Sequence, residues 1–354
     1  MPTSADILSY STLTPAVNEM KAPNSMLKNL LFGRDVTVPT RQIELSFLRR
    51  GRKIAPFVKR NGAALMTDGR NEEFRIVQPA HIRVKRPMNP SELLNKRRPG
   101  SVIHIDAGGI QAAMRQYMAD ELGMLMDDVT NSEEYLCALA LRGQISYSVS
   151  DEESITVTFP RSASHDVTLT GGDLWSAAST AKPAQDFMDA ATLINDDVSL
   201  NCTDVILGAD AADAFLAVDE VQERLNLNTG VALKTGAIDL NNQYQESGAM
   251  LLGVYVHGIR VWRYARQVSV AGSAVSLIRP DHAEFVARTP AAQFVTYYGA
   301  IEDMKAIGAG QVLQSKRFSK SWEEEDPSAR MLLVESNPLP CMRRPDASVS
   351  MKVV

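Results

Sequence analysis

The sequence is poor in the residues that build disulfide frameworks and metal centres. Its 354 residues include three cysteines and five histidines. Cys137, Cys202 and Cys341 lie far apart with no C-x-x-C spacing, so we expect buried free thiols and no disulfide framework. The histidines form no H-x-x-x-H or H-x-x-E-H pattern, and we interpret them as surface or hydrogen-bonded imidazoles rather than metal ligands.

Long apolar runs and the common catalytic motifs are also missing. No run approaches the roughly 20 apolar residues that span a bilayer, so we expect no membrane partner. The N-terminal "MPTSADILSYSTL" lacks the basic-then-apolar order of a signal peptide, which predicts a cytoplasmic chain. There is no G-x-S-x-G elbow and no G-x-x-x-x-G-K-[ST] phosphate loop. Gly308 and Gly310 form a G-x-G without the third glycine of a dinucleotide site. We therefore expect no catalytic residue, no cofactor and no metal; a hydrolase with a dispersed Ser-His-Asp triad is an alternative.

The overall composition is that of an ordinary globular protein. Hydrophobic residues make up 45% of the chain and charged residues 22%. The length is enough for two or three domains and a sizeable core. The net charge of −5 argues against a general nucleic-acid binder.

Charge is distributed unevenly along the chain. Between Thr40 and Gly100 there are 15 Lys and Arg against 5 Asp and Glu. Between Asp120 and Glu153 there are 9 Asp and Glu against the single Arg142. The two charged segments could be two solvated faces of the protein. They could also be the two halves of an interface between copies of the same chain. The candidate interface residues are Arg49, Arg50, Arg52, Lys53, Phe57, Lys59, Arg60, Asp120, Glu121, Asp127, Asp128, Asp151, Glu152 and Glu153.

The basic segment predicts strands that are not stable alone. "QIELSFL" alternates apolar and polar residues, and "RKIAPFV" and "EFRIVQPAHIRV" read as further strands, with turns at Asn61-Gly62 and Asp68-Gly69. Pro56 and Pro79 lack an amide donor, which indicates edge strands. A two-stranded ribbon is marginal in water, so this one needs a partner surface. Before it, residues 25–32 form a short amphipathic stretch whose apolar side chains suit docking on another surface.

A helical period follows. Apolar residues recur at three- and four-residue steps, which predicts a helix of about 20 residues, or roughly 30 Å. This apolar stripe consists of Ile110, Met114, Met118, Leu122, Leu125 and Val129. Asn131 and Glu134 match a capping box that would open a second helix, ended by Gly143. "QISYSVSDEESITVTFP" then predicts a hairpin around an acidic tip.

The second half of the chain predicts an α+β fold. A helix is expected over residues 182–195, then a buried strand at "TDVILG" and one or two helices in "ADAADAFLAVDEVQERL". Strand-like runs follow, including "AMLLGVYVHG", "IRVWRY" and "AEFVAR", and the chain ends in alternating strands. This order indicates a helical layer over a mixed or antiparallel sheet.

The layout and three stretches resemble the major capsid protein of tailed phages, of the lambdoid protein E family. The stretches are "KIAPFV" (53–58), "FRIVQPAHIRVKRPM" (74–88) and "KSWEEEDPSARMLLVESNPLPCMRRPDASVSMKVV" (320–354). The resemblance implies an N-terminal arm (1–40), an extended β-hairpin loop (41–100), a peripheral domain with a long spine helix (101–174), an axial domain (175–307) and C-terminal strands that return to the peripheral domain (308–354).

The same resemblance implies function and partners. It implies a non-enzymatic head protein that self-assembles, as hexamers and pentamers, into an icosahedral shell around double-stranded DNA. Each extended loop would lie on the peripheral domain of a neighbouring copy. The expected partners are a small decoration protein at three-fold sites, a scaffold and a portal during assembly in the host cytoplasm, and packaged DNA held without sequence specificity. Another self-assembling phage component, such as a tail-tube or connector protein, is the alternative.

Overall fold

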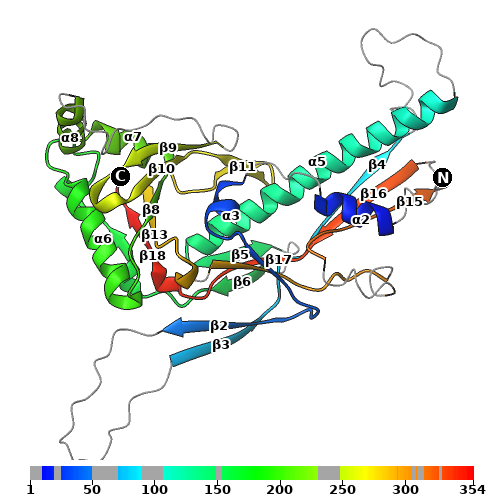
Figure 1. Cartoon of the computed structure of the whole chain (residues 1–354), viewed down its shortest axis with the longest axis horizontal. Coiled ribbons are helices and arrows are strands. Elements are labelled where there is room, and N and C mark those ends of the chain that lie inside the picture. Colours follow the sequence, from blue (N-terminus) through cyan, green and yellow to red (C-terminus); the bar gives the residue numbers. More distant parts are fainter. Residues whose placement is uncertain are drawn as a thin grey trace, which may run out of the picture.

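The computed structural model of the chain has an elongated body, with a long helix running to the upper right in Figure 1 and a narrow ribbon below. The described residues are 10–19, 25–49, 71–89, 107–148, 154–229, 248–292, 294–304, 308, 315–326 and 329–354. The predicted strand "RKIAPFV" and both predicted turns at residues 61–62 and 68–69 lie outside them.

The long helix α5, Ala107–Leu141, is a single helix of 35 residues. At 1.5 Å per residue it is about 52 Å long. The predicted division at Asn131 into two helices is wrong. A capping box needs its first residue to leave helical geometry, whereas Asn131 lies inside the helix and accepts a hydrogen bond from Arg266 at 2.6 Å. Gly143 ends the helical region as predicted, with a left-handed φ of +92°.

A three-stranded antiparallel sheet lies along α5, and we call it the α5 sheet. Its order is β15-β16-β4, with bounds Phe318–Glu324, Ala329–Ser336 and Ile82–Met88. Alternate residues of its strands, among them Leu332 and Val334, pack against α5 in one buried cluster. The predicted stripe is confirmed for the described side chains: Met118, Leu122, Leu125 and Val129 are buried in this cluster.

An N-terminal helix that the sequence did not predict packs along the β15 edge of this sheet. Helix α2, Tyr10–Glu19, adds Leu13 and Val17 to the same cluster. The hydroxyl of Thr14 donates to the carbonyl of Ser319 at 3.1 Å and accepts from its amide at 3.2 Å. One side chain thereby satisfies both groups of an edge-strand residue.

The lobe on the left of Figure 1 contains a six-stranded mixed sheet, which we call the large sheet. Its order is β7-β18-β13-β8-β10-β9, with bounds Asp166–Thr168, Ser348–Lys352, His282–Val286, Asp204–Leu207, Arg260–Tyr264 and Ala249–Val254. Three helices accompany it: α6, Pro183–Val198, α7, Ala209–Ala217, and α8, Asp219–Thr229. The predicted α+β class, the helix near residues 182–195 and the buried strand at "TDVILG" are confirmed.

The C-terminal strands divide between sheets. The resemblance implied that residues 308–354 return to the peripheral domain, and this division into domains stays a prediction. Strands β15 and β16 lie along α5, and β18 pairs with β13 and β7 in the large sheet. The shared apolar alternation of these strands carries no information about which sheet each one joins.

The remaining described strands form small sheets. The order β1-β14-β17 joins Arg34–Thr37, Phe294–Tyr298 and Pro338–Met342, and two hairpins pair β5, Gln144–Ser148, with β6, Ser154–Thr158, and β11, Gln267–Val270, with β12, Ser273–Ser276. The β5–β6 hairpin is the predicted one; its acidic tip lies outside the described residues. The ribbon pairs β2, Ile43–Arg49, with β3, Asn71–Val77.

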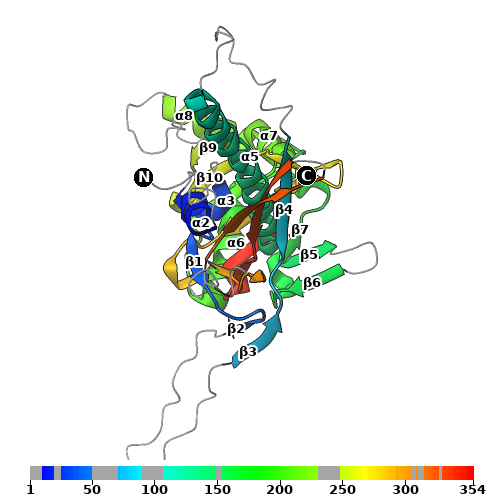
Figure 2. The same cartoon turned by 90° about the vertical axis from the view of Figure 1, so that its right-hand side faces the viewer.

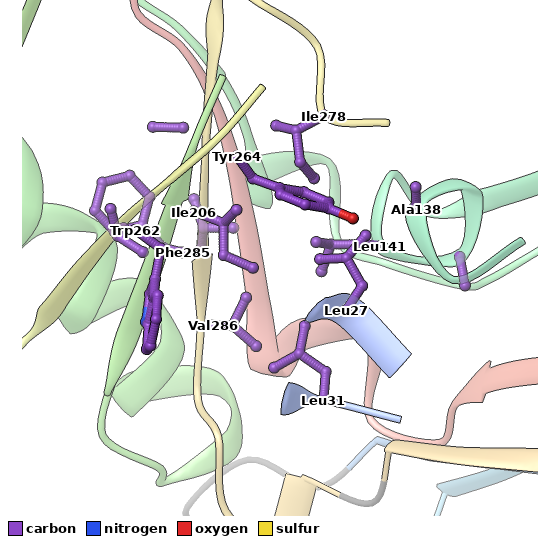
Figure 3. Packing of buried hydrophobic residues seen from close by; sticks show 14 of the residues in the cluster. Leu27, Leu31, Ala138, Leu141, Ile206, Trp262, Tyr264, Ile278, Phe285 and Val286 are labelled. Carbon is purple, nitrogen blue, oxygen red and sulfur yellow. The ribbon is translucent and has the colours of Figure 1, made fainter. Parts of the chain in front are cut away.

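The main core joins the arm, the long helix and the large sheet. Figure 3 shows Leu27 beside Leu141 at the C-terminal end of α5, and the hydroxyl of Tyr264 points from the large sheet toward the same helix. Leu27 belongs to the short helix α3, Met26–Leu30, which lies within the predicted stretch 25–32. We expected its apolar side chains to dock on another surface, but they are buried in the core of their own chain. All three cysteines are buried and unpaired, as predicted.

Candidate assembly interface

The ribbon uses one of its two faces to attach to its own chain. On that face Ile43, Leu45 and Phe47 of β2 are buried, and Phe47 packs edge-on against Phe159 with 6.0 Å between ring centroids. The guanidinium of Arg75 lies over Phe47, 5.9 Å from the ring centroid, and donates to the carbonyl of Thr158 at 2.7 Å. These contacts fix the base of the ribbon on the β5–β6 hairpin.

The opposite face of the ribbon is apolar and exposed. Phe74 and Ile76 alternate with the inward residues of β3 and are 58% and 71% exposed. Opposite them on β2 stand Ser46 and Glu44. On this face the Ser46 hydroxyl accepts from the guanidinium of Arg343, whereas Phe74 and Ile76 form an exposed apolar surface.

The long helix presents an acidic stripe on the side away from its core. Asp120, Met124 and Asp127 follow at steps of four and three residues, and all three are exposed. Asp128 adjoins this stripe and is exposed as well. Among the described residues, no cation lies within ion-pair distance of Asp120 or Asp127. Asp120 and Asp127 thus form an unneutralised acidic surface with Met124, 39% exposed, between them, and Asp128 borders it.

Glu121 differs from its acidic neighbours because it is buried. It is 5% exposed, and its carboxylate accepts from the guanidinium of Arg86 on β4 at 3.2 Å. Arg86 also lies 3.9 Å from the carboxylate of Asp128. A cation counted in the basic segment and an anion counted in the acidic one therefore pair within a single chain.

The other predicted interface residues belong to the loop after β2 and to the acidic tip of the β5–β6 hairpin. The structure describes the backbone of Arg49 at the end of β2 but not its side chain. The loop cations, Phe57 and the hairpin tip lie outside the described residues, namely Arg50, Arg52, Lys53, Phe57, Lys59, Arg60, Asp151, Glu152 and Glu153. Their place in an interface stays a prediction.

Helix α5 is anchored by the buried carboxylate of Glu134, which the sequence analysis assigned to a capping box within the same helix. Glu134 accepts from the amides of Leu27 and Lys28 at 2.7 and 2.9 Å, and from the hydroxyl of Tyr264 at 2.8 Å. It thereby caps α3 from another helix, while the side chain of Ser25 makes no cap bond. Burial raises the pKa of Glu134, although the amide bonds act in the opposite direction. One side chain joins arm, long helix and large sheet.

The preceding residue holds the α5 sheet. The carboxylate of Glu133 accepts from the guanidinium of Arg317 at 2.9 Å, and the same guanidinium donates to the Thr130 hydroxyl at 3.1 Å. Burial alone would lower the pKa of Arg317, but the Glu133 carboxylate outweighs it and the pKa is raised. No sequence motif marks this pair, because its partners are 184 residues apart.

The described residues offer little for catalysis or metal binding. No group of three or more His, Cys, Asp and Glu side chains among them could hold a metal ion. His165 is buried, with its ring nitrogens 2.9 Å from the carbonyl of Ser348 and 2.8 Å from a carboxylate oxygen of Asp197. It is a hydrogen-bonded structural imidazole, as predicted for this residue. None of the described helices has the length and apolarity to cross a membrane.

Phage capsid proteins are among the solved structures with this arrangement. A protein described as the capsid protein of a prophage of Escherichia coli CFT073 superposes with a TM-score of 0.72 at 16% identity, covering 98% of this chain and 99% of that chain. The capsid protein of the cyanophage P-SCSP1u gives a TM-score of 0.51 at 9% identity, covering 95% and 90%. The architecture is therefore the phage capsid fold, as predicted.

Sequence comparison gives the family. The profile described as phage major capsid protein E matches residues 9–353, and the chain belongs to this family. The major capsid protein of Enterobacteria phage P21 and the P21 prophage-derived major head protein of E. coli O6:H1 are each 24% identical over 345 residues, covering 93% of this chain and 94% of theirs. The family, the phage capsid function and the virion location are thus as predicted, and the family is structural rather than enzymatic. The match over nearly the whole chain favours the shell protein over a tail-tube or connector component.

Proposed function

We propose that this major capsid protein assembles as hexamers and pentamers, with the extended loop of each copy lying on the acidic stripe of α5 in a neighbouring copy. The observation that carries the proposal is the ribbon, whose inward face packs on its own chain while Phe74 and Ile76 on the other face are exposed. In the sequence, the loop after β2 holds the densest cluster of Arg and Lys, and Asp120, Asp127 and Asp128 offer an anionic surface of opposite charge.

In the proposed contact, the charges fix how neighbouring copies align, and burial of apolar side chains supplies most of the binding free energy. An exposed ion pair contributes at most about 1 kcal/mol. Covering a large apolar side chain such as Phe74 or Ile76 contributes about 1.5–3 kcal/mol. Because the same contact recurs at every copy, modest individual terms are enough to define a shell while errors stay reversible.

The proposed partners follow from this role. They are copies of the chain, a small decoration protein at three-fold sites, a scaffold and portal during assembly in the host cytoplasm, and double-stranded DNA contacted without sequence specificity. The net charge of −5 fits a shell filled by a motor, because a protein that condenses DNA by itself should be basic. We propose no enzymatic activity, cofactor or membrane contact.

The test is a charge exchange between loop and helix. Reversing Arg49, Arg50, Arg52 and Lys53 to Glu should abolish particles while the monomer stays folded. Reversing Asp120, Asp127 and Asp128 to Lys should do the same, and combining both sets in one chain should restore particles. The readouts are sedimentation and negative-stain images, with circular dichroism for folding.

The matched control reverses exposed cations elsewhere, Lys182→Glu with Arg288→Glu, and should assemble normally. Normal particles from either interface-reversed set would overturn the proposed contact.

A further inference from the structure

The chain protects the two edges of the α5 sheet in different ways. Strands β15 and β4 form these edges, and Figure 2 shows α2 and β4 on opposite sides of the sheet. An unprotected edge strand is a template for pairing with another chain. Strand β4 carries Pro87, which lacks an amide donor, and the exposed cations Arg83 and Lys85, all of which oppose such pairing. Strand β15 contains no proline and lies against α2 instead.

Helix α2 imitates a neighbouring strand. The Thr14 hydroxyl bonds both the amide and the carbonyl of Ser319, and the side-chain amide of Asn18 donates to the carbonyl of Arg317 at 2.9 Å. Thr14 and Asn18 are four residues apart on a helix, which is about 6.0 Å along its axis. Arg317 and Ser319 are two residues apart on the edge, which is about 6.8 Å. The helical repeat therefore nearly matches the repeat of the backbone groups that point out of the edge.

Helix α2 depends on this docking for its own stability. It has ten residues, fewer than the roughly 12–15 that an isolated helix needs in water. Pro15 lies inside it and has no N–H to bond the carbonyl four residues earlier. Leu13 and Val17, buried in the cluster between α5 and its sheet, are the apolar anchors. A helix that is stable only while docked leaves the edge uncovered whenever it detaches.

The uncovered edge is complementary to itself. Both backbone groups of Ser319 point out of the sheet, because Thr14 bonds both of them. In an antiparallel pair, such a residue exchanges both hydrogen bonds with the residue directly opposite. Two copies related by a two-fold axis at Ser319 would therefore pair β15 with β15 and join their α5 sheets. In this register Lys320 faces Phe318 and Arg317 faces Ser321, so these residues bring no like charges together.

We propose that α2 is an autoinhibitory cover, which prevents two copies of the chain from pairing through β15. Its side chains occupy the backbone groups that a second β15 would bond. The inference goes beyond the proposed shell function, because the covered edge is apart from the ribbon and the cover acts on chains that have not yet assembled.

The first test detaches α2 in the full chain. Leu13→Asp with Val17→Asp places two charges where α2 meets the α5 sheet, so exchange of the Ser319 amide should become about tenfold faster. Pro15→Asp with Ala16→Asp adds the same charge at exposed positions of the same helix and should leave exchange slow. Unchanged exchange in the detached variant would overturn the inference.

The second test traps the pairing of unassembled chains by mild oxidation. Ser319→Cys in the detached variant should give a disulfide-linked dimer on a non-reducing gel, because opposite Cα atoms are about 5.5 Å apart in such a pair. Ser321→Cys in the same variant should give none, because its opposite residue is Arg317. The native cysteines are buried. In the parent and the control chain, α2 covers position 319, and Ser319→Cys should stay monomeric on the gel.

A third variant separates strand pairing from unspecific association. Ser321→Pro, added to the detached Ser319→Cys chain, removes an amide from the same edge and should abolish the dimer. Equal linkage through positions 319 and 321 would overturn the inference, as would fast Ser319 exchange without any dimer. No step depends on particle formation, so the shell function stands or fails separately.

Discussion

Removing the carboxylate of Glu134 should loosen the arm and the large sheet from α5 together. The side chain is fully buried and receives three hydrogen bonds, from the Leu27 and Lys28 amides and the Tyr264 hydroxyl. Hydrogen bonds to a charged group contribute about 1.5–3 kcal/mol each, offset by the several kcal/mol needed to desolvate the carboxylate. We expect Glu134→Ala to lower the free energy of unfolding by about 3–5 kcal/mol, a large part of the roughly 5–15 kcal/mol of a typical domain.

Glu134→Gln separates charge from shape. The amide keeps one accepting oxygen, so Glu134→Gln should lower the free energy of unfolding by about 1–3 kcal/mol. Burial raises the pKa of Glu134 above its ordinary value of 4.5. The folded protein therefore holds a proton at a pH where the unfolded chain has released it. Relative to Glu134→Gln, the parent chain should lose stability as the pH rises from 4.5 through the folded pKa.

The assay is urea unfolding of the monomer, with hydrogen exchange at the Leu27 and Lys28 amides as the local readout. Asp127→Asn, exposed on the same helix, is the control and should change stability by less than about 0.5 kcal/mol. Equal unfolding midpoints for Glu134→Ala and the control, or unchanged protection of the two amides, would refute the reasoning.

Three other outcomes are expected. Burial raises the pKa of Asp186 to about 6, so the parent chain should lose stability relative to Asp186→Asn as the pH rises from about 4 to 7. Melting curves at both pH values check this, with Asp196→Asn, exposed on the same helix, as the control. A Cβ at Gly208 would lie 2.1 Å from a backbone oxygen, so Gly208→Ala should give little soluble chain, and a normal melting curve would contradict the geometry. Thr14→Val keeps the shape of the side chain but removes both hydrogen bonds to Ser319. It should lower the free energy of unfolding by about 1–3 kcal/mol and speed hydrogen exchange of the Ser319 amide. Unchanged exchange would show that α2 does not protect this edge.

Local pattern was sufficient where one face of an element is buried. The alternation of "QIELSFL" predicted β2, and the helical repeat predicted the buried side of α5. The Asn131–Glu134 pattern misled because a capping box and a mid-helix pair look the same in sequence. Helix α3 decides between the two, because Glu134 accepts hydrogen bonds from its amides more than 100 residues away.

Charge counted along the chain overstated the candidate interface for a related reason. Glu121, Glu133 and Glu134 all belong to the acidic segment, but each is buried and bonded within the chain. Arg86 of the basic segment is likewise used internally. A sequence sum treats such residues as surface, and only the fold shows that Asp120 and Asp127 are left over.

The ribbon joins the continuous interior of the arm, the long helix and the lobe only through Ile43, Leu45 and Phe47 at its base, whereas Phe74 and Ile76 further along its other face are exposed. For the proposed hexamers and pentamers, we therefore expect the body of the subunit to keep one shape. We expect the difference between five and six neighbours to be taken up where the ribbon leaves the β5–β6 hairpin.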